Sequence, residues 1–224
     1  MSTGPGDRRP GTKPKYRPQR PSRMTMALFA PVIAPLSPAR LADLLAFFDG
    51  DAFSDNPSWS SCYCQCFYED HRKIQWSSRT ATENRDRATE RCQSGEMQGY
   101  LAYLDRSVVG WCNAAPRRML HALDAEPLLG ADCIGCILCF LVSPPARGKG
   151  IARALLEAAC EGLRAQGLRY AEANPRPNAR SCAEQHFGPL PMYLSAGFVV
   201  ERADADGSVW VRRPLNPVGT PAGT

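Results

Sequence analysis

The chain lacks an apolar segment long enough to cross a bilayer. A membrane-spanning helix needs about 20 consecutive apolar residues, whereas the apolar stretch at residues 24–36 is interrupted by Pro31 and Pro35. A helix-start signal, Ser37-Pro38, follows at once, which argues against a signal peptide. We therefore interpret residues 27–36 as a first strand, and we expect no membrane partner.

The body of the chain also lacks an excess of positive charge. The 224 residues have a net charge of +5, but seven of the 27 Lys and Arg residues lie in residues 1–23, beside a single acidic residue. Residues 24–224 therefore hold 20 basic and 21 acidic residues, a net charge of −1. Nucleic-acid binding favours a basic face on a folded domain, so we do not expect a nucleic-acid partner. A contact of the basic tail with RNA is the remaining alternative.

Residues 1–23 have few apolar side chains and contain five prolines and three glycines. Such a composition cannot bury enough surface to order the chain, so we predict a basic, Pro-rich disordered tail. The remaining length suffices for one hydrophobic core. We predict a single folded domain over residues 24–215 and a flexible C-terminal end over residues 216–224.

Ten cysteines raise the question of disulfides or a metal site. Without a secretion signal, reduced thiols in the cytoplasm are the better interpretation, and those in apolar runs act as small hydrophobic residues. Cys62, Cys64 and Cys66 would point the same way on a strand at intervals of about 6.5–7 Å. Zinc ligands must converge to about 2.3 Å from one ion, so we expect no metal.

The apolar pattern predicts alternating strands and helices after the tail. A helix begins at Ser37-Pro38 and ends at Gly50, and residues 51–79 are predicted to be a loop with one short strand at 62–68. The nearly continuous apolar run Ile134–Val142 is typical of a strand buried on both faces. The other predicted elements are a helix at 80–92, a hairpin of 98–104 and 108–115, a helix at 151–166, a strand at 168–173, a short helix at Leu190–Ser195, and closing strands at 198–202 and 208–213.

A glycine-punctuated turn joins the buried strand to the following helix. The start of a helix exposes free N–H groups that suit a phosphate or diphosphate. Gly148 and Gly150 would let an anion approach the backbone, while Arg147 and Lys149 add positive charge. The turn matches neither the Walker loop nor the dinucleotide-binding fingerprint.

The details of this turn resemble a known family. Arg147-x-x-Gly150-x-Ala152, preceded by Val142-x-Pro144, resembles the acetyl-CoA motif of the GNAT superfamily of N-acetyltransferases. Residues 192–198, with the sequence MYLSAGF, resemble that family's later motif, in which a short helix bearing a tyrosine leads into a strand. The resemblance is specific over residues 134–213 and compatible with the order of elements back to about residue 27.

The resemblance implies an α/β (α+β) fold with a mixed, mostly antiparallel sheet of six to seven strands flanked by helices. Its fourth and fifth strands, Ile134–Val142 and 168–173, would splay apart and hold the pantetheine arm of acetyl-CoA, the co-substrate. An amine would attack the thioester directly in a ternary complex. The residues implied for cofactor binding are Leu141 and Val142 through their backbone and Arg147, Gly148, Lys149, Gly150, Ile151 and Ala152 around the diphosphate.

The resemblance also implies catalytic roles. Tyr193 matches the position of the family's usual general acid, and a backbone N–H near Leu141 would meet the oxyanion. Members often carry a glutamate on the fourth strand, but Ile134–Val142 contains no acid. Glu172 is the preferred substitute as the base, with Asp132 and His186 as alternatives.

The acceptor is expected to be a small-molecule or peptide amine. Residues near the third strand and several aromatic residues are candidates for its pocket, and core packing explains them equally well. The missing strand glutamate supports one alternative function, a non-catalytic acetyl-CoA-binding regulatory or interaction module. The formation of a homodimer is left as an open alternative. The candidate acceptor residues are Trp59, Tyr63, Tyr68, Trp111, Asn113, Arg117 and Arg118.

Overall fold

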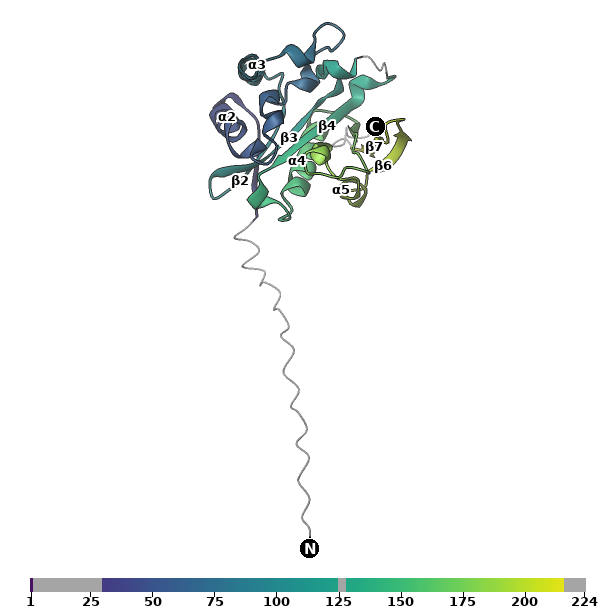
Figure 1. Cartoon of the computed structure of the whole chain (residues 1–224). Coiled ribbons are helices and arrows are strands. Elements are labelled where there is room, and N and C mark those ends of the chain that lie inside the picture. Colours follow the sequence, from purple (N-terminus) through teal and green to yellow (C-terminus); the bar gives the residue numbers. More distant parts are fainter. Residues whose placement is uncertain (2–29, 125–127, 216–224) are drawn as a thin grey trace, which may run out of the picture. The chain divides into compact units, whose positions relative to one another are not determined.

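One seven-stranded sheet, in the order β1-β2-β3-β4-β5-β7-β6, forms the centre of the computed structural model (Figure 1). The structure describes residues 1, 30–124 and 128–215, so the predicted tail at 1–23 and the C-terminal end at 216–224 lie outside the described residues. Neighbouring strands are antiparallel except for the parallel pair β4–β5. The strands are β1 (Val32–Pro35), β2 (Gly99–Leu104), β3 (Ser107–Pro116), β4 (Ile134–Val142), β5 (Tyr170–Ala173), β6 (Val199–Ala203) and β7 (Val209–Pro214).

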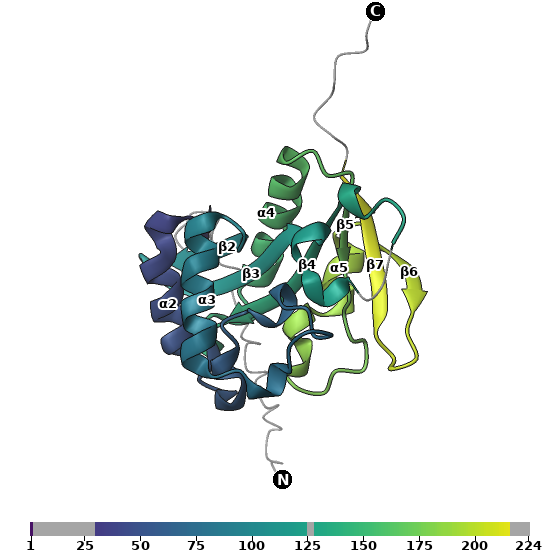
Figure 2. The ribbon, with the colours of Figure 1, turned by 90° about the horizontal axis from the view of Figure 1, so that it is seen from above.

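Helices cover both faces of the sheet and create two hydrophobic cores (Figure 2). Helices α2 (Leu41–Asp49) and α3 (Ala81–Ser94) pack on one face, where Phe48 and Trp111 are almost fully buried. Helices α4 (Ile151–Ala165) and α5 (Leu190–Ser195) pack on the other face. Full burial of a large apolar side chain stabilises a fold by about 1.5–3 kcal/mol, so the two cores together fix the sheet between the helix layers.

Strands β4 and β5 pair over a short stretch and then separate. The register joins Ile134 to Tyr170 and Cys136 to Glu172, and β4 continues to Val142 with no further β5 partner among the described residues. The short 3-10 turn η10 (Glu184–Phe187) packs against β4 beyond that point. The splayed strands and the mostly antiparallel seven-stranded sheet confirm the expected fold.

A β-bulge lies within the β3–β4 pairing. Asn113 is opposite Cys139, but the next residue, Ala114, is opposite Ile137. Strand β4 therefore contains one extra residue, Leu138, relative to its partner, which is the definition of a bulge. As a result, Leu138 and Cys139 both face the α2–α3 core, while Phe140 faces α4 and α5.

The predicted strand at 62–68 is wrong. That segment forms two 3-10 turns, η3 (Pro57–Cys62) and η4 (Cys66–Tyr68), separated by the left-handed residues Tyr63 (φ 45°) and Cys64 (φ 59°). The apolar alternation arises because Tyr63, Cys64 and Tyr68 pack into the α2–α3 core from a turn rather than from a strand.

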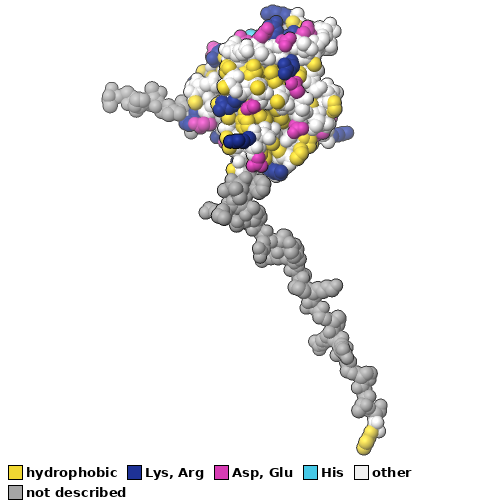
Figure 3. All heavy atoms as spheres, turned by 90° about the vertical axis from the view of Figure 1, so that its left-hand side faces the viewer, with side chains coloured by type: hydrophobic (Ala, Val, Ile, Leu, Met, Phe, Trp, Pro, Cys, Tyr) yellow, Lys and Arg dark blue, Asp and Glu magenta, His cyan; other side chains and the backbone are white. Residues whose placement is uncertain are grey.

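Two general features of the described residues bear on the function classes considered. All ten cysteines are free thiols, and no three His, Cys, Asp or Glu side chains within 30–124 and 128–215 are grouped to hold a metal ion. In the same ranges every helix is too short or too polar to span a bilayer. Figure 3 shows basic and acidic side chains interspersed on one face of the domain.

Helix α3 begins with a reciprocal cap. The Glu83 N–H donates to the Thr80 hydroxyl (3.2 Å), and the Thr80 N–H donates to the Glu83 carboxylate (2.8 Å). This capping box satisfies two N–H groups that the first turn would otherwise leave without partners.

We predict that Thr80→Ala lowers the free energy of unfolding by about 1–2 kcal/mol, the usual cost of losing such a cap. Thr82→Ala, an exposed position in the same first turn, is the matched control and should change stability by less than about 0.5 kcal/mol. Chemical denaturation with linear extrapolation measures both values. Equal values for the two variants would contradict the prediction.

Candidate active site

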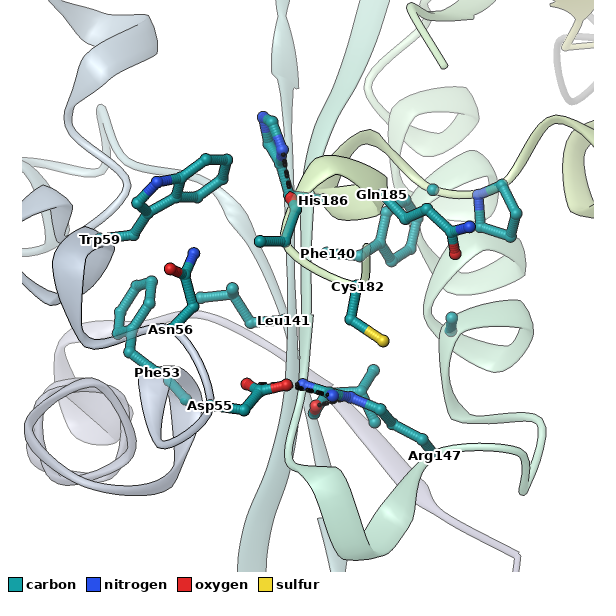
Figure 4. A pocket seen from close by; sticks show the side chains of 16 residues that line it. Phe53, Asp55, Asn56, Trp59, Phe140, Leu141, Arg147, Cys182, Gln185 and His186 are labelled. Carbon is teal, nitrogen blue, oxygen red and sulfur yellow. Dashed lines mark hydrogen bonds and ion pairs between the residues drawn. The ribbon is translucent and has the colours of Figure 1, made fainter. Parts of the chain in front are cut away.

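A cleft of about 300 Å³ lies where β4 has separated from β5 (Figure 4). Three segments far apart in the sequence form its walls: residues 140–142 of β4, the segment between α2 and η3, and the loop that precedes α5. Arg147 and Ala152, at the start of α4, line it as well. The wall residues include Phe53, Asp55, Asn56, Trp59, Phe140, Leu141, Val142, Cys182, Gln185, His186 and Gly188.

The turn before α4 has the geometry of an anion-binding loop. Gly148 (φ 72°) and Gly150 (φ 79°) are both left-handed, a conformation that favours glycine. A Cβ atom at either position would meet nothing within 4 Å, so open space faces the loop. The first hydrogen bond of α4 runs from the Ala154 N–H to the Gly150 carbonyl (3.0 Å), which leaves the preceding amides directed out of the helix. This donor set fits a diphosphate.

Arg147 connects the loop to two of the three walls of the cleft. Its Nε donates to the Val142 carbonyl (2.9 Å), and its two terminal nitrogens donate to the Asp55 carboxylate (2.5 and 3.1 Å). The guanidinium beside Asp55 lowers the pKa of that carboxyl below its usual value. Asp55 is therefore an anion, paired across the cleft with a cation 92 positions later in the sequence.

His186 lies in the cleft wall with its ring edge-on to Trp59, the ring centres 4.8 Å apart. Its Nδ1 is 2.9 Å from the Ala183 carbonyl. A carbonyl can only accept, so we assign the proton to Nδ1, which leaves the Nε2 lone pair available. Burial lowers the pKa of His186 to about 4, and the ring is neutral at pH 7.

Tyr193 lies one layer behind the cleft. It is fully buried, its hydroxyl donates to the Phe187 carbonyl (2.6 Å), and its ring contacts Phe140 edge-on. A Cβ atom on Gly188, a cleft residue, would lie 3.1 Å from the hydroxyl, so the phenol lies directly behind this glycine. Burial raises the pKa of Tyr193, which keeps the hydroxyl protonated.

The two predicted carboxylate bases lie away from the cleft. Glu172 is opposite Cys136, four residues or about 13 Å along β4 from Phe140. Its carboxylate accepts from Arg212 (2.8 Å) and is 3.8 Å from Arg117, an arrangement that gives it a structural role. Asp132 is exposed just before the start of β4, at the far end of the strand from the cleft. Of the three candidates for the base, His186 is the one that lines the cavity.

The predicted acceptor residues likewise fall into those that line the cleft and those that do not. Trp59 lines the cleft. The other aromatic residues, together with Asn113 and Arg117, belong to the buried interior, and Arg118 is exposed outside the cleft. Sequence reasoning missed Asp55, Asn56 and Phe53, which follow α2 in a segment without periodicity. It also missed Cys182 and Gln185, because their loop has no helical or strand pattern.

The low pKa of His186 predicts a pH dependence of stability. Its folded pKa of about 4 is below the unfolded value of 6.5, so the unfolded state binds more protons between these values. The contribution of His186 to the free energy of unfolding is therefore fully present above about pH 6.5. It falls by up to about 3 kcal/mol as the pH decreases towards 4. We predict that His186→Gln flattens this part of the stability curve, measured by denaturant titration at pH 4–7. Parallel curves of unfolding free energy against pH for wild type and His186→Gln would contradict the prediction.

Comparisons with solved structures agree with this architecture. An N-acetyltransferase from Staphylococcus aureus Mu50 matches at 16% identity over 84% of this chain and 99% of its own, with a TM-score of 0.53. The PaiA N-acetyltransferase from Thermoplasma acidophilum, in complex with coenzyme A, matches at 17% identity over 83% and 99% (TM-score 0.51). A phosphinothricin acetyltransferase from Sinorhizobium meliloti, in complex with acetyl-CoA, matches at 19% identity over 83% and 88% (TM-score 0.52). These likenesses establish a shared fold.

The sequence itself gives the family. No curated protein matches it. The family model described as "Acetyltransferase (GNAT) family" matches residues 68–188, more than half of the chain, and its span includes β4, the anion-binding turn and the loop that lines the cleft. The chain therefore belongs to the GNAT family of acetyltransferases.

Proposed function

We propose that this protein transfers the acetyl group of acetyl-CoA to a primary amine by direct attack within a ternary complex. The observation that supports this most strongly is the separation of β4 from β5 directly beside the left-handed glycines of the α4 turn. A strand with a free edge and a helix start with free amides suit the two polar parts of one ligand, a pantetheine arm and a diphosphate. The coenzyme complexes of the two structural neighbours named above agree with this assignment.

The chain's own residues suffice to hold such a ligand. The amides of Gly148, Lys149, Gly150, Ile151 and Ala152 would bind the diphosphate, and the backbone of Leu141 and Val142 would pair with the pantetheine arm. When bound, acetyl-CoA supplies an activated acetyl group as a thioester. A backbone N–H of β4 near Leu141, on the edge that β5 leaves, would stabilise the oxyanion that forms as the amine attacks, since Leu141 itself is paired with Trp111 of β3.

Two proton transfers accompany this reaction. We assign to His186 Nε2 the hydrogen bond that receives the amine proton and relays it, directly or through a water, to solvent. His186 lines the cleft and Glu172 does not, and a ring with a pKa of about 4 does not keep the proton at pH 7. Tyr193 remains the proposed acid for the departing thiolate, because its hydroxyl lies directly behind Gly188 in the cavity wall. The catalytic domain would span residues 24–215, and the segments that flank it would take no part in the reaction. The protein would act in the cytoplasm.

A screen of primary amines with the full-length protein and acetyl-CoA tests the proposal. A thiol reagent that reacts with free CoA measures turnover. We expect acceptor amines to cause CoA release that depends on the enzyme and saturates as the amine concentration rises. The alternative, a non-catalytic acetyl-CoA-binding module, has two supporting observations: β4 carries no glutamate, and the Tyr193 hydroxyl donates to the Phe187 carbonyl. CoA binding by calorimetry without turnover of any small-molecule or peptide amine would favour that alternative. Absence of CoA binding would reject both.

We predict that Gly150→Glu lowers the affinity for CoA at least about 100-fold, because a left-handed residue with an anionic side chain would occupy the diphosphate site. Gly167→Glu is the matched control, since Gly167 (φ 81°) is equally left-handed but lies past the other end of α4. Isothermal calorimetry of both folded variants measures the effect. Similar CoA affinities in the two variants would contradict the diphosphate assignment.

We predict that Tyr193→Phe lowers kcat about 100-fold while CoA affinity changes little, because the hydroxyl acts on charge that develops only as the C–S bond breaks. The lost hydrogen bond to Phe187 also costs about 1 kcal/mol of stability. Tyr68→Phe is the matched control, because it removes a buried hydroxyl bonded to Gln98 and Asn113 outside the cleft. If both variants keep near-normal kcat, Tyr193 has no part in the proton transfer.

A further inference from the structure

The strap, defined here as residues 51–62, brings a carboxylate to the mouth of the cleft. It comprises η2 (Asp51–Phe53), Asp55, Asn56 and η3. Among the described residues that line the cavity, Asp55 and Arg147 are the two charged ones, since His186 is neutral. Figure 4 shows their side chains meeting across the cleft from opposite walls.

This ion pair occupies groups that a bound diphosphate would also use. Arg147 begins the anion-binding turn, and its guanidinium and Ala152 line the same cavity. A guanidinium binds carboxylate and phosphate oxygens in the same bidentate way, so its two terminal nitrogens cannot serve both anions fully. Nε lies apart from this competition, because it donates to the Val142 carbonyl.

The balance of energies favours the diphosphate. Asp55 and Arg147 side chains are 40% and 32% exposed, and partly exposed ion pairs contribute only modestly to stability. A diphosphate carries more charge than one carboxylate and gains the free amides at the start of α4 in addition. It would also repel the Asp55 carboxylate from the cleft mouth.

We propose that acetyl-CoA binding exchanges the counter-ion of Arg147 from Asp55 to the diphosphate, and that the released Asp55 carboxylate binds the ammonium group of the acceptor. This inference rests on the proposed function. Cofactor would then bind before acceptor, because the acceptor's anionic partner is unavailable until the exchange has occurred.

The position of Asp55 suits this second role. One guanidinium contacts both the Asp55 carboxylate and the Val142 carbonyl, so the carboxylate faces the end of β4 and lines one cavity with Leu141, near the proposed site of the thioester carbonyl. Trp59, on the same strap and 38% exposed, adds an aromatic face that attracts cations. With no other acid among the described lining residues, an ammonium-bearing amine is the acceptor class that this wall selects.

Calorimetric titration of the full-length protein with CoA and with pantetheine, which lacks the diphosphate, tests the exchange. Asp55→Asn should bind CoA about three- to tenfold more tightly at low salt, with a smaller gain at about 0.5 M salt, where charges are screened. Its affinity for pantetheine should be unchanged. Asp51→Asn, a control on the same strap outside the cavity lining, should match wild type for both ligands.

A double-mutant cycle identifies the route of the effect. In an Arg147→Gln background, the factor by which Asp55→Asn increases CoA affinity should fall to less than half of its value in the wild-type background, because the competing ion pair no longer exists. Unchanged or weaker CoA binding by Asp55→Asn, or an equal gain for pantetheine, would overturn the exchange. If wild type itself fails to bind CoA, the proposed function is at fault instead.

Turnover tests the acceptor role with the amine of highest kcat/KM from the CoA-release screen. Asp55→Asn should raise the KM of that amine at least about tenfold, with a much smaller change in kcat, while Asp51→Asn keeps both values. An uncharged hydroxylamine-type acceptor or an arylamine should be far less sensitive to Asp55→Asn than an alkylammonium. Equal KM values in the two variants would overturn the ammonium assignment.

Discussion

A strand that loses its neighbour halfway along a sheet leaves backbone polar groups that need other partners. Strand β4 is in this position, because β5 pairs with its first three residues and then departs. The cleft, the packing of η10 and the contact of Arg147 with the Val142 carbonyl all lie beyond that point. The separation of the two strands therefore determines where the cleft and the groups that line it lie.

Arginine side chains hold the two ends of this opening. At the paired end, Glu172 on β5 accepts from Arg212 on β7 and lies near Arg117, which ties the strands to the segment after β3. At the open end, Arg147 bridges β4 and the strap. The first set is buried and belongs to the fold, whereas the Asp55–Arg147 pair is half-exposed and so can be rearranged at small cost in free energy.

The sequence predicted most of the fold because its elements have clear local signals. The run Ile134–Val142, the glycines around α4 and the helix Leu190–Ser195 each have a characteristic period or boundary residue. The site was only partly predictable. Asp55 reaches the cleft from the turn between η2 and η3, and Trp59 from η3 itself, and neither segment has a period to detect. The distance of Glu172 from the cleft could not be predicted, because the face of a strand can be inferred from sequence but the position of a residue along the neighbouring strand depends on the pairing register.

The bulge at Leu138 makes one position of β4 tolerant of a change in length. Leu138 and Cys139 face the same core, so removal of Leu138 would restore simple alternation and leave Phe140 against Tyr193. At other positions of β4 successive side chains alternate between the two faces, and a one-residue deletion there would turn the rest of the strand over. The bulge is therefore the place where the gene can lose a codon during divergence while β4 keeps its part of the cleft wall.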